Sequence, residues 1–111
     1  MNNYSYEGVN MKKEINIIEL SEFYKMFSDS TRLKILMILL NEKLCVNDIA
    51  TKINMSQSSV SHQLKILRYN NFVKYERKGK EIYYSLADSH IKIILKYGIE
   101  HINERGLYEK D

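Results

Sequence analysis

The chain has 111 residues, 44% of them apolar, which suffices for one domain whose small core would gain from burial in a dimer. Its single cysteine, Cys45, excludes an intrachain disulfide framework, and no apolar run is long enough for a membrane span or a secretory signal. Together with a net charge of only +3, which excludes a polycation, these features predict a cytoplasmic protein with no membrane partner.

The first part of the chain is predicted to hold a flexible arm and two core helices. The arm, residues 1–13, is polar and rich in tyrosine and asparagine, and we assign it no function. Apolar residues then repeat at helical spacing in two sets, which are Leu20, Phe23, Tyr24 and Phe27, and Leu33, Leu36, Met37 and Leu40. The cluster Ser28, Asp29 and Ser30 between the two sets is typical of a helix cap.

A third, short helix and a tight turn are predicted next. The helix is indicated by the spacing of Val46, Ile49, Ala50 and Ile53. Asn54 and Met55 form the turn, and Ser56 caps a fourth helix. Met55 and Val60 occupy the two positions of a hydrophobic staple, which would direct the chain into that helix. This succession is a helix-turn-helix pattern.

The fourth helix carries a polar and basic face opposite its apolar side. Val60, Leu64 and Leu67 fall on the apolar side. The opposite arc of about 140° holds Gln57, Ser58, Ser61, His62, Lys65 and Arg68. Small hydrogen-bonding side chains at the start of such a helix can approach base edges in the major groove, while cations further along neutralise phosphates. We expect this face to bind double-stranded DNA; the alternative is a merely solvated helix face.

Two short strands joined by a basic turn are predicted after the fourth helix. Residues alternate with period two at Val73, Tyr75, Ile82, Tyr84 and Leu86. The turn between them is centred on Gly79, and residues 61–80 hold six cations against the single acid Glu76. This hairpin is predicted to be a wing. Contacts with DNA phosphates are expected from Arg77, Lys78 and Lys80, unless these exposed cations only aid solubility.

The last helix carries two histidines and two carboxylates. It is predicted to run from Ser89 to Glu104, in a domain that spans residues 14–106 and leaves a short tail at 107–111. Its apolar surface is formed by Ile91, Ile94, Leu95, Ile99 and Ile102. His90 and His101 would lie about 16 Å apart along the helix but within roughly 20° of the same azimuth. One chain alone therefore cannot close a metal site on this face.

A dimer would bring the four groups together. The candidate ligands are Asp88, His90, His101 and Glu104. If two such helices pack antiparallel about a twofold axis near Leu95 and Lys96, the first two ligands of one chain meet the last two of the other, and two sites form. Imidazole and carboxylate without thiolate suit zinc, cobalt or nickel, and four protein ligands make a closed set that favours regulation over hydrolysis. Alternatively, Asp88 is only the helix N-cap and Glu104 belongs to a solvated polar end.

Three motifs carry a family resemblance, namely residues 30–36 (STRLKIL), 44–50 (LCVNDIA) and 56–64 (SQSSVSHQL). With them, the segment from Phe23 to Glu104 resembles the ArsR/SmtB family of repressors. The resemblance implies a mainly α fold with a small β-hairpin wing, a winged helix-turn-helix that forms a homodimer through its terminal helices. Members with Asp-x-His followed by His-x-x-His or His-x-x-Glu on the last helix look like zinc and cobalt sensors, and Asp88, His90, His101 and Glu104 match this pattern. Their metal-free dimer would bind operator DNA, and metal would release it and derepress efflux or resistance genes.

One departure from the family narrows the choice of inducer. A branch that senses thiophilic ions carries Cys-x-Cys near the third helix, whereas this chain has Cys45 followed by Asn47. Sensing of arsenite, cadmium or lead there is disfavoured, and Cys45 is expected to be a buried small residue. One alternative is a DNA-binding regulator without metal sensing, constitutive or redox-responsive through Cys45. A zinc hydrolase is opposed by the closed ligand set, so we expect no enzymatic activity.

Overall fold

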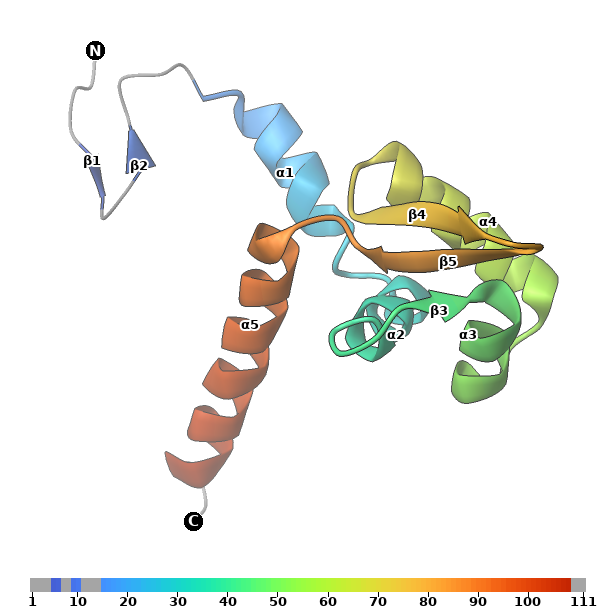
Figure 1. Ribbon diagram of the computed structural model, residues 1–111. Coiled ribbons are helices and arrows are strands. Elements are labelled where there is room, and N and C mark those ends of the chain that lie inside the picture. The colour runs from blue at the N-terminus through green and yellow to red at the C-terminus, as the bar shows by residue number, and fades with distance from the viewer. Residues whose placement is uncertain (1–4, 7–8, 11–14, 109–111) are drawn as a thin grey trace.

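The elements of the domain follow the predicted order. The computed structural model describes residues 5–6, 9–10 and 15–108. Its elements are β1 (Ser5–Tyr6), β2 (Val9–Asn10), α1 (Ile17–Lys25), α2 (Ser30–Ile38), β3 (Leu44–Cys45), α3 (Val46–Ile53), α4 (Gln57–Tyr69), β4 (Val73–Lys78), β5 (Glu81–Leu86) and α5 (Ser89–Tyr108). Within these residues, helices and a three-stranded antiparallel sheet form a winged helix-turn-helix (Figure 1), which confirms the predicted fold class.

The boundaries predicted for the arm and the tail stay predictions. Most of the arm, residues 1–13, lies outside the described residues, as does the end of the tail at 109–111. The described pieces of the arm are β1 and β2, which pair antiparallel with each other. Among the described helices, none combines the length and the apolar character that crossing a membrane requires.

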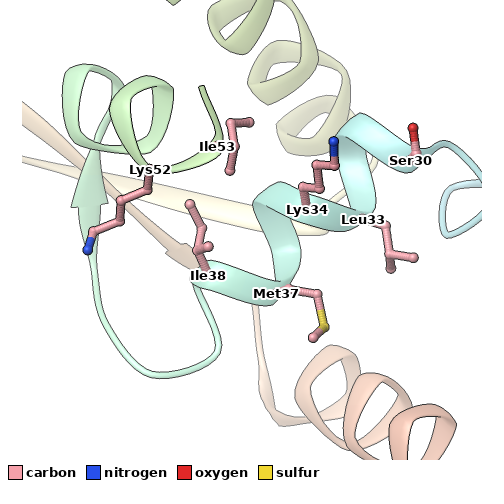
Figure 2. Close-up of a pocket in the computed structure, with 7 residues that line it drawn as sticks. All are labelled: Ser30, Leu33, Lys34, Met37, Ile38, Lys52 and Ile53. Atoms are coloured by element: carbon pink, nitrogen blue, oxygen red, sulfur yellow. The ribbon is translucent and has the colours of Figure 1, made fainter. Parts of the chain in front are cut away.

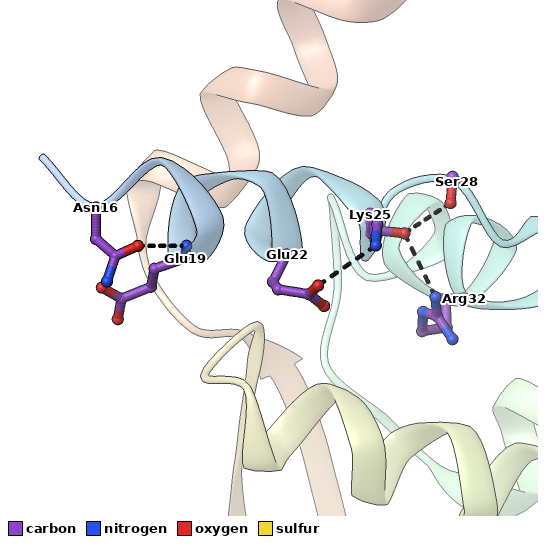
Figure 3. Close-up of polar contacts among 6 residues, drawn as sticks. All are labelled: Asn16, Glu19, Glu22, Lys25, Ser28 and Arg32. Atoms are coloured by element: carbon purple, nitrogen blue, oxygen red, sulfur yellow. Dashed lines mark hydrogen bonds and ion pairs between the residues drawn. The ribbon is translucent and has the colours of Figure 1, made fainter.

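Side-chain caps begin α1, α2 and α4. The Asp29 carboxylate accepts the backbone N–H of Arg32 at 3.0 Å and so begins α2, as the polar cluster before that helix predicted. Ser56 Oγ accepts the backbone N–H of Ser59 at 3.1 Å, which confirms the predicted cap of α4. Asn16 caps α1 in the same way (Figure 3). Each cap satisfies a donor that the first helical turn would otherwise leave unpaired.

Arg32 on α2 joins three helices. Its Nε donates to the carbonyl of Met26 at 3.2 Å, and its Nη2 donates to the carbonyl of Lys25 at 3.5 Å (Figure 3). Its Nη1 donates to Gln63 Oε1 on α4 at 3.4 Å. Since Lys25 ends α1, the rigid fork of the guanidinium fixes where α1 stops relative to α2 and α4.

The turn between α3 and α4 has the predicted chemistry. Asn54 adopts the left-handed conformation with φ 57° and ψ 53°, which asparagine tolerates better than most residues, and it ends α3. The backbone N–H of Met55 bonds to the carbonyl of Ala50 at 3.0 Å. Met55 packs against the core and Val60 is fully buried, as expected for the two staple positions.

The wing contains one strand that the sequence pattern did not predict. β4 and β5 pair antiparallel with Val73 opposite Leu86 and Lys78 opposite Glu81, and Gly79 turns the hairpin with φ +65°. β3 adds to the free edge of β5, giving the order β3-β5-β4. Two residues are too few to display an alternating pattern, so β3 left no signal in the sequence.

The core lies between α2, α3, α4 and the first turns of α5. Its fully buried side chains are Ile35, Leu36, Ile49, Val60, Leu64, Leu67 and Phe72. The ring of Phe72 lies 5.0 Å from that of Phe23 and 5.1 Å from that of Phe27, measured between centroids. The predicted inclusion of Phe27 in the first helix and of Leu40 in the second is wrong, because α1 ends at Lys25 and α2 at Ile38. Both residues still pack against the core from the following loops.

The expectation that the first two helices only fill the core is wrong for α1. None of its side chains is buried, and Ile17 and Ile18 are 69% and 76% exposed.

α5 is held at its N-terminal half by the buried Ile91 and Leu95, and it runs four residues beyond the predicted end, away from the body of the domain (Figure 1). In this view α1 and α5 lie on the side opposite to the tip of the hairpin.

Replacing Phe72 by Ala should lower the free energy of unfolding by about 3–5 kcal/mol, because it removes a buried ring from the aromatic contacts that hold α1. Urea unfolding at one fixed protein concentration measures the change. Tyr69→Ala is the matched control: Tyr69 is 86% exposed, so its replacement should cost no more than about 0.5 kcal/mol. Equal losses in the two variants would contradict this account of the core.

Candidate nucleic-acid interface and metal-ligand positions

The exposed face of α4 borders a shallow hollow beside the wing. The hollow is lined by Ser58, Ser61, His62, Leu64, Lys65, Arg68 and Tyr84. Five of these are residues that the helical spacing assigned to the polar face, and all five are exposed. Val60 and Leu67 are buried on the other side of the helix, and Leu64 is also buried although it borders the hollow. The structure therefore brings five of the predicted interface residues together on one surface.

Gln57 lies at the start of the same helix and is held by α3. Its Nε2 donates to Asn47 Oδ1 at 2.8 Å. This bond uses one of the two amide hydrogens and leaves the second hydrogen and the carbonyl oxygen free, which is the pair that bidentate adenine recognition requires. Gln63 of the same helix faces inward instead, where Arg32 donates to it. Asn47 did not emerge as a site residue from the sequence because its contact with Gln57 depends on how α3 and α4 pack.

Glu76 on β4 is paired with a cation from outside the wing. Arg77, Lys78 and Lys80 are exposed at the end of the hairpin. Glu76 accepts a hydrogen bond from Lys43 Nζ at 2.7 Å. That bond and the charge of Lys43 lower the pKa of the Glu76 carboxyl below its ordinary value. The single acid of the basic segment is thus neutralised from the loop before β3, and the wing keeps a cationic surface.

Asp88 and His90 lie together at the start of α5. The Asp88 Oδ1 atom accepts the backbone N–H groups of His90 at 2.9 Å and of Ile91 at 3.2 Å, so Asp88 is the N-cap of the helix. Its other oxygen, Oδ2, lies 3.6 Å from His90 Nδ1. Capping and proximity to the imidazole therefore coexist, and the two readings of Asp88 are not exclusive.

His101 and Glu104 lie far along α5 from this pair and are exposed. Eleven residues of helix separate the two histidines by about 16 Å. Among the residues that the structure describes, no group of three or more histidine, cysteine or acidic side chains could hold a metal ion. The chain by itself thus brings Asp88 and His90 together, and it leaves His101 and Glu104 far from that pair along the helix.

Cys45 is buried, as expected from its apolar neighbours. Its Sγ donates to Asp48 Oδ2 at 3.4 Å, which is a weak bond inside the first turn of α3. A thiol that is covered and bonded in this way is a poor redox sensor, because reactivity needs an accessible thiolate.

Large apolar side chains are exposed mainly on one side of the domain. Within the described residues, the exposed large apolar side chains lie between residues 15 and 37 or on α5, with the exception of Tyr69 and Tyr75. A hollow between α2 and α3 borders this surface, and none of the predicted site residues lines it. Figure 2 shows that Leu33 and Met37 point from α2 away from Ile38 and Lys52. Exposed apolar side chains gathered on a few elements are typical of interaction sites.

Comparison with known proteins points to bacterial regulators. Residues 29–75 match the family of bacterial regulatory proteins named after arsR. The chain is 41% identical over 86 residues to a transcriptional repressor SmtB homolog of Synechocystis, a match that covers 78% of this chain and 65% of that protein. It is 38% identical over 90 residues to a cadmium resistance transcriptional regulatory protein CadC homolog of Staphylococcus aureus, covering 80% of this chain and 74% of that one.

Solved structures agree with the fold. HlyU from Vibrio cholerae superposes with a TM-score of 0.70 at 26% identity, and the match covers 77% of this chain and 92% of that chain. The arrangement of helices and wing is therefore that of known winged helix-turn-helix regulators.

Replacing Lys43 by Met should raise the pKa of Glu76 towards its ordinary value, because the hydrogen bond and the positive charge that lower it are both removed. Since this pKa is depressed in the folded state, its contribution to stability is present above the ordinary pKa and is lost as the pH falls through the lowered one. NMR titration of the side-chain carboxyl carbon measures the change. Lys52→Met, which removes a cation paired with Glu42 instead, should leave Glu76 unaffected, and a pKa of Glu76 that is the same in both variants would refute the assignment.

Proposed function

The chain belongs to the ArsR family of bacterial regulatory proteins, and on this basis we propose that it is a metal-responsive transcriptional repressor. As a member of that family it is a DNA-binding regulator and not an enzyme. We propose that the metal-free homodimer binds operator DNA in the cytoplasm. Zinc, or cobalt or nickel, bound between the terminal helices would lower the DNA affinity and derepress genes of metal efflux or resistance.

The distribution of side chains around α5 carries the proposal. At about 100° per residue, the two histidines, Glu104, Ile93 and Tyr97 share roughly 80° of the helix surface. Ile93 and Tyr97, between the histidines, are 47% and 67% exposed, whereas Ile91 and Leu95 attach the helix to its own domain from another side. The face with the candidate ligands is thus apolar in its middle and has no partner among the described residues. A second copy of α5 running antiparallel would cover it.

The ligand set fits a first-row divalent ion. The carboxylate of Asp88 already lies beside the His90 ring, and the partner's His101 and Glu104 would complete four nitrogen and oxygen donors. When bound, the ion would cross-link the anchored end of one terminal helix to the far end of the other. Asp88 keeps the start of α5 helical through its cap, so binding requires no unwinding of that end.

The DNA-binding roles rest on the opposite side of the domain. We propose that base edges are contacted by Gln57, Ser58, Ser61 and His62. Phosphates would be contacted by Lys65, Arg68, Arg77, Lys78 and Lys80. Because α5 lies away from the hairpin tip (Figure 1), we propose that metal acts on DNA binding at a distance and not by direct contact. It acts by changing the spacing of the two recognition helices, and the coupling is reciprocal, so operator DNA must weaken metal binding by the same factor.

A second function, a constitutive or redox-responsive regulator, has less support. The redox version needs an accessible thiolate, whereas Cys45 is covered. The constitutive version predicts no stoichiometric metal.

His101→Gln should abolish the release of DNA by zinc while preserving DNA binding without metal, because it removes one ligand from each site and leaves α4 intact. Zinc titrations with and without operator DNA, followed by anisotropy, measure both properties. Glu100→Gln is the matched control, since it changes the neighbouring side chain and should keep the response. Equal zinc affinity with and without DNA in the unsubstituted protein would end the allosteric claim, and loss of DNA binding in His101→Gln would contradict the assigned roles.

Gln57→Ala should weaken specific DNA binding by about 1–3 kcal/mol, because it removes a side chain placed for bidentate base contact. Gln63→Ala provides the comparison within the same helix: its loss leaves Arg32 with one bond fewer and should reduce stability, not sequence preference. Competition between operator and mixed-sequence duplexes separates the two effects. A relaxed preference in Gln63→Ala but not in Gln57→Ala would reverse the assignment.

A further inference from the structure

A stack of three side chains connects the end of α4 to the wing. The guanidinium carbon Cζ of Arg68, in the last turn of α4, lies 4.5 Å from the centre of the Tyr75 ring on β4. The Tyr75 ring in turn meets the Tyr84 ring at 6.0 Å and 69°, an edge-to-face arrangement. Tyr75 and Tyr84 are directly opposite each other in the antiparallel register of β4 and β5.

The stack is anchored at one end and open at the other. Tyr84 packs against the hydrophobic core and also lines the hollow on α4, whereas Tyr75 is 47% exposed and Arg68 is exposed. Packing against the core therefore restricts the Tyr84 ring, the Tyr84 ring restricts Tyr75, and Tyr75 restricts the guanidinium. A long side chain at a helix end would otherwise sample many rotamers.

The contact holds the guanidinium over the Tyr75 ring and leaves its N–H donors available. The five N–H donors lie in the plane of the group, and among the described residues none of them makes a hydrogen bond within the chain. A guanidinium held at the hollow on α4 with unpaired N–H donors suits bidentate contact with a phosphate. Lysine could supply the charge at this place but not the planar fork of N–H donors.

We propose that Tyr75 is a positioning residue for DNA binding, which holds Arg68 in the orientation that contacts a phosphate and links the wing to the recognition helix. This inference rests on the proposed DNA binding. Tyr75 acts through Arg68 and needs no contact with DNA of its own. The sequence pattern assigned Tyr75 only to strand alternation, because its partner on α4 becomes visible only after the wing folds back.

The test measures binding of the metal-free full-length protein to a short mixed-sequence DNA duplex over a range of salt concentrations, since phosphate contacts do not depend on sequence. Tyr75→Leu should weaken binding roughly two- to fivefold, the size of an exposed cation–π contact, whereas Tyr75→Phe keeps the ring and should bind as the unsubstituted protein does. Arg68→Ala should reduce the slope of log affinity against log salt by about one. Thermal unfolding of each variant verifies that the domain remains folded.

The decisive comparison is Tyr75→Leu in the Arg68→Ala background, where it should cause no further loss of affinity. An equal loss in both backgrounds would show that Tyr75 only supports the wing and would overturn the inference, as would unchanged binding by Tyr75→Leu alone. Failure of the unsubstituted protein to bind any duplex would overturn the proposed function itself and this inference with it.

Discussion

The burial of one side of α4 is the constraint on which the rest of the molecule depends. Val60, Leu64 and Leu67 have at most 1% of their surface exposed, so α4 cannot rotate about its axis without uncovering apolar area that costs about 25 cal/mol per Å². The left-handed Asn54 and the cap of Ser56 determine where the helix begins. With rotation and start both fixed, the polar side chains of α4 must face outward beside the wing.

The buried and exposed faces of the helices could be predicted from the sequence, because apolar residues repeat at helical spacing over about three or four turns. The buried side of α4, the cap at Ser56 and the alternation of the hairpin were each visible in this way. Contacts between elements could not be predicted. No local pattern encodes such contacts, because they depend on how elements far apart in the chain are packed. Examples are the pairing of β3, the hydrogen bond from Gln57 to Asn47 and the cation–π contact of Arg68 with Tyr75.

The candidate metal ligands illustrate the same limit from the other direction. Their shared azimuth on α5 follows from helical geometry, and the structure adds that the apolar residues between them, Ile93 and Tyr97, are exposed. The cap of Asp88 was foreseen as a competing explanation, yet the carboxylate that caps the helix also lies 3.6 Å from the His90 ring. A position can serve local structure and a wider assembly together, so finding one role does not remove the other.

The anchoring of α5 at only one half has a mechanical consequence for a dimer. Ile91 and Leu95 attach the N-terminal half of the helix to its domain, whereas residues 100–105 are exposed and the helix runs away from the body of the domain (Figure 1). In an antiparallel pair, each site would combine the root of one helix with the free tip of the other. A small displacement at either site would therefore rotate a whole domain. The length of the projecting part of α5, about 1.5 Å per residue, would set how far the DNA-binding surfaces move.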